Sequence, residues 1–209
     1  IRTLPDLPSS IPAVGDDHFY LEYDALVVAV GAKVNSFGVP GVDKHALFLK
    51  EAKDARAVRK RIHNLLEAAS LPIVDEAKRR ALLTFVICGA GPTGVELTAE
   101  LGDWLRDVSR SRRYGDLADL ARVVLVEASG EILSTFDKHL QSYALGALRS
   151  GRIEVRLGSK VKEVLSDAVV LESAVAPPSG TSTGEHGSTT ERLPCGMVVW
   201  SAGVGSRDL

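Results

Sequence analysis

The chain has 209 residues, of which 45% are apolar and 25% are charged, and its formal net charge is −2. These values are typical of a soluble globular protein that buries one large domain, or one domain and part of another. The near-balanced charge argues against nucleic acid as a partner, and no apolar run is long enough to span a membrane. The two cysteines, Cys88 and Cys195, lack the spacing of a metal site or a disulfide framework, so we expect no bound metal.

The first third of the chain predicts two strands, a turn and a helix. Residues 19–21 and the continuously apolar run 25–30 predict a short strand followed by a buried one that ends at Gly31. Pro40 and Gly41 occupy the two central positions of a predicted type II turn. Between 47 and 69, apolar residues recur at helical spacing, and Pro72 ends this helix.

Strands and helices then alternate. The apolar runs 82–88 and 122–127 predict buried strands, and helices are expected at about 93–110, 116–120 and 135–149. A strand at 153–157 precedes an antiparallel pair at 161–164 and 168–172, a flexible loop at 176–190 and a last strand at 197–200. The predicted fold class is α/β, a Rossmann-like domain with a parallel sheet and a small antiparallel sheet.

The segment Gly89-Ala90-Gly91-Pro92-Thr93-Gly94 joins the first of these buried strands to a helix. In a dinucleotide-binding loop, the first glycine permits the tight turn, the second lets the backbone approach a pyrophosphate, and the third lets the helix pack closely on the strand. The helix start, with Pro92 and Thr93, offers free N–H groups and a positive dipole to phosphates. Because strand, loop and helix follow in this order, we predict a dinucleotide site.

Glu127 ends the second buried strand, 33 residues after Gly94. A carboxylate there accepts hydrogen bonds from both ribose hydroxyls of an adenosine and repels a 2′-phosphate, which favours NADH over NADPH. The simplest template places this acid about 20 residues after the motif, and a longer helix with the polar stretch 106–119 accounts for the excess. Glu96, in the first turns of the helix, is explained by favourable interaction with the helix dipole.

The segment 85–97 closely resembles the NADH-binding loop of type II (alternative, rotenone-insensitive) NADH dehydrogenases. Segments 23–32, 35–42, 48–51, 136–138 and 196–204 resemble further motifs of that family, in the same order. Several motifs in the correct order are more specific than the glycine loop alone. The residues around Trp200 look most similar to mitochondrial members.

The resemblance implies a flavoprotein with two Rossmann domains, in which FAD accepts hydride from NADH and passes electrons to a membrane quinone without proton pumping. It implies a peripheral location on the mitochondrial inner membrane and is compatible with a homodimer. Glu96 matches a family glutamate near the flavin and the nicotinamide, and becomes the catalytic candidate. The turns Gly31-Ala32 and Ala202-Gly203 match those that approach the two cofactors through their backbone.

The chain departs from a whole family member, because no glycine motif for FAD precedes residue 24. We therefore expect an internal fragment whose membrane- and quinone-binding regions are absent. Residues 1–80 would be part of a discontinuous FAD domain with a connecting helix, 81–197 the NADH domain, and 198–209 the return strand. Such a fragment should bind NADH weakly at best and lack quinone reductase activity.

Three alternatives stay open from the sequence. A ferredoxin or disulfide reductase shares the strand, loop and turns, although this chain has no redox-active cysteine pair. An NADH-sensing or scaffold protein could keep the fold without turnover. A methyltransferase also has a glycine-rich loop after a strand, but its cofactor has no pyrophosphate for the helix start.

Overall fold

The computed structural model describes residues 21–174 and 188–207, and the chain divides into two compact units, 1–31 and 32–209. In the first unit, residues 21–31 are exposed and form neither helix nor strand. The strand predicted at 25–30 is therefore wrong for this structure, and Val27 is 85% exposed. A strand needs neighbours for its backbone hydrogen bonds, and no described strand pairs with this run. Most of the strand predicted at 19–21 lies outside the described residues.

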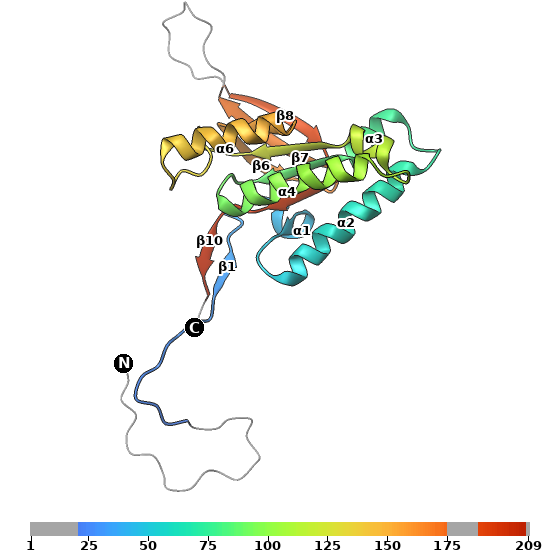
Figure 1. Ribbon diagram of the computed structural model, residues 1–209. Helices are drawn as coiled ribbons and strands as arrows, with labels where there is room; N and C mark the ends of the chain where they lie inside the picture. The colour runs from blue at the N-terminus through green and yellow to red at the C-terminus, as the bar shows by residue number, and fades with distance from the viewer. Residues whose placement is uncertain (1–20, 175–187, 208–209) are drawn as a thin grey trace, which may run out of the picture. The chain divides into compact units, whose positions relative to one another are not determined.

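The second unit is built on a five-stranded parallel sheet in the order β2-β9-β3-β4-β5. Figure 1 shows the helices and the other strands arranged around this sheet. The strands in this order are β2 (Leu47–Phe48), β9 (Met197–Trp200), β3 (Thr84–Cys88), β4 (Arg122–Val126) and β5 (Glu154–Arg156). β3 lies at the centre, β4 lies on one side of it, and β9 returns to the other side. This reversal of strand order beside β3 is a topological switch point, where α/β proteins bind ligands at the carboxyl ends of the strands.

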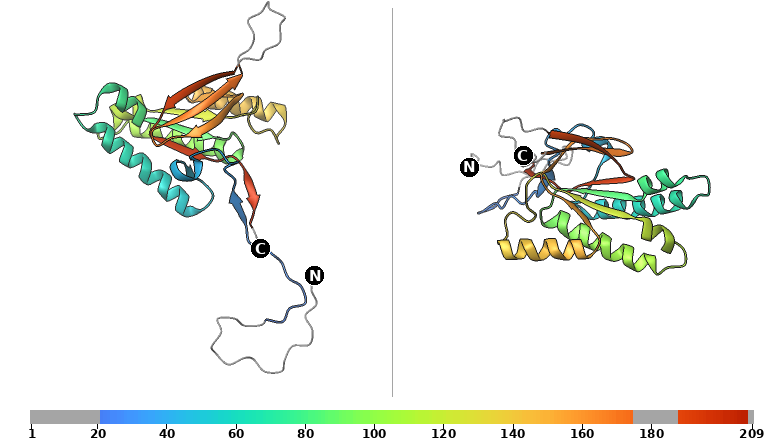
Figure 2. Two further views of the ribbon diagram at one scale, coloured as in Figure 1. Left: turned by 180° about the vertical axis from the view of Figure 1, so that it is seen from behind. Right: turned by 90° about the horizontal axis from the view of Figure 1, so that it is seen from above.

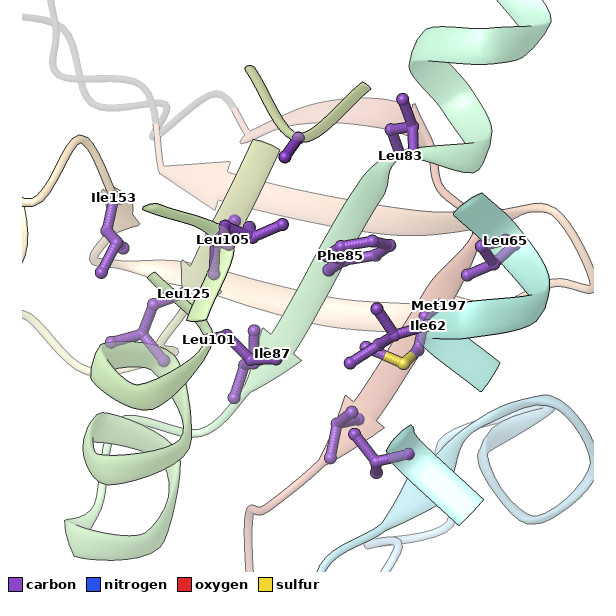
Figure 3. Packing of buried hydrophobic residues seen from close by; sticks show 14 of the residues in the cluster. Ile62, Leu65, Leu83, Phe85, Ile87, Leu101, Leu105, Leu125, Ile153 and Met197 are labelled. Atoms are coloured by element: carbon purple, nitrogen blue, oxygen red, sulfur yellow. The ribbon is translucent and has the colours of Figure 1, made fainter. Parts of the chain in front are cut away.

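Helices cover one face of this sheet (Figure 2). They are α2 (Ala52–Ser70), α4 (Pro92–Ser109), α5 (Gly115–Leu120) and α6 (Lys138–Ser150). The two other helices of the described residues are α1 (Val42–His45) and α3 (Glu76–Leu82). Phe85 and Ile87 of β3 point toward this face and pack with Ile62 of α2 and Leu101 of α4 (Figure 3). This helical face holds the larger of the two buried apolar clusters.

A three-stranded antiparallel sheet, β6-β7-β8, covers the opposite face. Its strands are β6 (Ser159–Val164), β7 (Ala168–Ala174) and β8 (Ser188–Pro194). Val86 of β3 and Val124 of β4 pack here against Val169 and Leu171 of β7. Successive residues of β3 thus point alternately into the two clusters, and because both faces are covered, all five are buried. This explains the continuous apolar run in the sequence.

The structure confirms the predicted α/β class, with its parallel sheet and small antiparallel sheet. Gly41 has φ +78° and ψ −8°, as the predicted type II turn requires. A ribbon of β1 (Ala32–Val34) and β10 (Val204–Ser206) completes the unit. The sequence did not predict α1, α3, β1 or β2, nor β8, whose start falls inside the stretch 176–190 expected to be a loop. β2 and α2 pack with β3, β4 and β9. The division of the chain into domains at residues 1–80, 81–197 and 198–209 stays a prediction.

Two glycines of the loop differ in what surrounds them. A Cβ at Gly94 would overlap the carbonyl oxygen of Gly89, whereas a Cβ at Gly91 would meet nothing within 4 Å. We expect Gly94→Ala to destabilise the fold by about 2 kcal/mol or more, because backbone atoms must move apart, and to lower Tm by about 4–8 °C.

Gly91→Ala is the matched control and should leave the free energy of unfolding within about 0.5 kcal/mol of the wild-type value. Differential scanning calorimetry of the two variants measures the difference. Equal stabilities would contradict the close approach of α4 to β3.

Candidate functional site

The glycine loop turns the chain sharply from β3 into α4. Gly89 has φ +102°, a conformation that favours glycine, and its N–H donates to the carbonyl of Val126 at 2.8 Å. Gly91 is the N-cap residue of α4, and Pro92 is its first residue, where the missing N–H leaves no helical hydrogen bond unmade. Gly94 is buried against Gly89. The loop therefore brings the start of α4 to the carboxyl end of β3.

The start of α4 is free to bind an anion. No side chain caps this end of the helix. The helix continues for 18 residues, so its first turn carries the partial positive charge of a long helix dipole. Uncapped amides and this dipole together suit a phosphate group.

Glu127 lies directly after β4 and faces the glycine loop. Its Oε2 accepts a hydrogen bond from the N–H of Ala90 at 2.7 Å, and its Oε1 accepts one from the N–H of Ser129 at 2.8 Å. The carboxylate is therefore oriented before any ligand arrives. An ionised carboxylate has about four lone-pair sites, so each oxygen still has room to accept a ribose hydroxyl.

The turn after β9 lies against the same loop. The Ser201 hydroxyl donates to the carbonyls of Cys88 and Gly89 at 3.0 and 3.1 Å. A Cβ at Gly89 would lie 2.8 Å from the amide nitrogen of Ala202, so the two backbones are in close contact. Gly203 follows with φ +77°. Ser201 was not predicted as a site residue, because a single serine in a turn does not indicate a function by itself.

These segments enclose a crevice of about 560 Å³ at the carboxyl ends of the strands. Among the predicted site residues, Gly89, Gly91, Glu127, Ala202 and Gly203 line it. They come from the ends of β3, β4 and β9. Phe37 and Lys160 also line the crevice and were not predicted as site residues.

The other predicted residues lie elsewhere. Thr93 and Glu96 line a second, mainly apolar groove of about 560 Å³ between α2 and α4. Pro92 is exposed, and Gly94 supports the loop from below without lining the crevice. Ala32 pairs with Ser206 in the β1–β10 ribbon.

The two thiols are buried and unreactive near neutral pH. Burial raises the pKa of Cys88 far above its ordinary value and that of Cys195 to about 12. Since the thiolate is the reactive form, neither cysteine is a nucleophile near neutral pH.

Within residues 21–174 and 188–207, no three His, Cys, Asp or Glu side chains gather in a way that could hold a metal ion. No helix there combines the length and apolar character needed to cross a lipid bilayer.

A parallel sheet with a glycine turn, an open helix start and a terminal acid at its switch point defines a Rossmann-type dinucleotide-binding unit. The model of the pyridine nucleotide-disulphide oxidoreductase family matches residues 9–209. The chain belongs to this family.

Two named relatives are similar to most of this chain. A probable NADH dehydrogenase from Dictyostelium discoideum is 42% identical over 91% of this chain and 39% of its own length. The mitochondrial external alternative NAD(P)H-ubiquinone oxidoreductase B4 from Arabidopsis thaliana is 41% identical over 92% of this chain and 31% of its own length.

The solved structure of NDH2 from Plasmodium falciparum in complex with NADH superposes with a TM-score of 0.79 at 28% identity, over 90% of this chain and 36% of that one. The chain thus spans between 31% and 39% of the length of these relatives.

Proposed function

We propose that this chain forms the NADH-binding part of an FAD-dependent NADH:quinone oxidoreductase that does not pump protons. In this proposal, residues 81–197 are the NADH domain, and residues 1–80 and 198–209 belong to a discontinuous FAD domain. Quinone and the membrane surface would bind regions outside this chain, and the proposal is compatible with a homodimer. The proposal places the protein peripherally on the mitochondrial inner membrane; the names of the relatives support the mitochondrial part of it.

One observation carries the proposal. The open start of α4 and the oriented carboxylate of Glu127 meet in one crevice at the switch point of the sheet. A pyrophosphate fits the first feature and an adenosine ribose the second. A dinucleotide carries both groups, whereas the cofactor of a methyltransferase has no pyrophosphate.

Four further residues are assigned to contact with the flavin or the nicotinamide. Ala202 and Gly203 are small, line the crevice and let a flat ring approach the backbone. Gly31 has φ +75° and open space where a side chain would stand, which also suits close approach, and Ala32 follows it. When bound, FAD supplies the acceptor for the hydride of NADH. Glu96 keeps its assignment as the catalytic candidate on α4.

The role of Gly91 can be tested directly. In Gly91→Val, the side chain has room within the fold but stands where the pyrophosphate must approach. We expect the affinity for NADH, measured by isothermal titration calorimetry, to fall by at least about tenfold, or about 1.4 kcal/mol, at unchanged Tm. If NADH binds this variant as it binds the wild type, the loop is purely structural.

The role of Glu127 is tested by Glu127→Gln. The amide keeps the shape of the side chain but loses the charge and turns one acceptor into a donor. NADH should bind about tenfold more weakly, because hydrogen bonds to charged groups contribute about 1.5–3 kcal/mol. The preference for NADH over NADPH should shrink, because the charge that repels a 2′-phosphate is gone. Unchanged discrimination between the two nucleotides would remove Glu127 from the site.

Two alternatives to this function are a disulfide reductase, which the buried thiols disfavour, and an NADH sensor, which an experiment distinguishes. A disulfide reductase needs reactive thiols, and the pKa values of both cysteines of this chain are raised by burial. A non-catalytic NADH sensor would bind NADH without reducing FAD. For the whole protein, we expect stopped-flow absorbance to show rapid bleaching of the flavin by NADH. Binding of NADH without bleaching would identify a sensor.

A further inference from the structure

Phe37 lies at the edge of the crevice, and both its exposure and its backbone conformation are unusual. It is a large apolar side chain, yet it is 63% exposed and lines the crevice beside Gly203. Its backbone has φ +51°, and the next residue, Gly38, has φ +68°. With the hydrogen bond from the Val39 N–H to the Ser36 carbonyl at 3.0 Å, these angles have the pattern of a type I′ turn.

This conformation is unfavourable for phenylalanine. Glycine, asparagine and aspartate dominate the central positions of type I′ turns, because a positive φ brings Cβ too close to the backbone. For a bulky side chain such as phenylalanine, a positive φ is a true outlier. Such strain persists only where the surroundings enforce it, and it concentrates at functional sites.

Three neighbours hold the turn in place. The carboxamide Oδ1 of Asn35 accepts a hydrogen bond from the Phe37 N–H at 2.8 Å. The indole N–H of Trp200 donates to the Asn35 carbonyl at 3.0 Å, which ties the turn to the end of β9. A Cβ at Gly203 would lie 2.6 Å from the Phe37 ring, so the ring packs directly on the bare Cα of this glycine. The aromatic ring is therefore fixed at the mouth of the crevice.

The sheet order decides which part of a dinucleotide lies near this ring. Glu127 follows β4 on one side of β3, and Phe37 packs on the turn after β9 on the other side. With the adenosine ribose at Glu127 and the pyrophosphate at the start of α4, the nicotinamide half extends toward β9.

We infer that Phe37 is a nicotinamide-binding residue, whose ring makes an aromatic contact with the nicotinamide, and that Asn35 and Trp200 are its positioning residues. The inference rests on the proposed function. An aromatic contact orients a flat ring, and orientation of the nicotinamide is what hydride transfer requires of the protein.

The test compares two ligands on the whole protein by isothermal titration calorimetry. ADP-ribose keeps the adenosine and the pyrophosphate of NADH but lacks the nicotinamide. We expect Phe37→Ala and Phe37→Gly to weaken NADH binding by about tenfold and to leave ADP-ribose binding unchanged within about twofold. Phe37→Tyr, which keeps the aromatic face, should bind both ligands like the wild type.

Stability provides the second readout. Because glycine relieves the strained backbone, Phe37→Gly should have a Tm no lower than that of the wild type, even though its affinity for NADH falls. A residue kept only for the fold would show a lower Tm on the same substitution. Undiminished NADH affinity, or equal losses for NADH and ADP-ribose, would overturn the inference about Phe37 alone. If the wild-type whole protein binds neither ligand, the proposed function fails as well.

Discussion

The site depends on how closely α4 approaches the end of β3. Gly94 lies so near the carbonyl of Gly89 that even a methyl group would not fit between them. This approach places the uncapped amides of α4 at the carboxyl edge of the sheet, beside the ends of β4 and β9. A wider turn would move the helix start away from Glu127 and separate the two groups that a dinucleotide bridges. In the proposed function, the same contact serves both packing and ligand binding.

Much of this arrangement was predictable from the sequence, because local chemistry and tertiary packing agree there. β3 and β4 are continuous apolar runs because both faces of the sheet are covered. The glycine loop was recognisable because its three glycines have the spacing of a dinucleotide-binding loop between a buried strand and a helix, and Glu127 was found by its place at a strand end. Its hydrogen bond to Ala90 was not predictable, since it depends on how β4 aligns with β3 in space.

Other features could not be predicted from local pattern. The run 25–30 has the composition of a buried strand, but strand formation requires partners that no periodicity reveals. Phe37 was part of a recognised segment, yet only the three-dimensional structure shows that its backbone is strained and that its ring packs on Gly203. Contacts between residues 35–37 and 200–203 join segments that lie 165 residues apart in the sequence, and such long-range contacts leave no local sequence pattern.

The β1–β10 ribbon has a consequence for how this unit connects to other parts of a protein. Its two strands pair antiparallel from Ala32 with Ser206 to Val34 with Val204, so the chain enters and leaves the unit through neighbouring strands. Paired strands lie about 5 Å apart. A polypeptide could therefore accept everything between these strands as an insertion at a single point, as it would accept a hairpin.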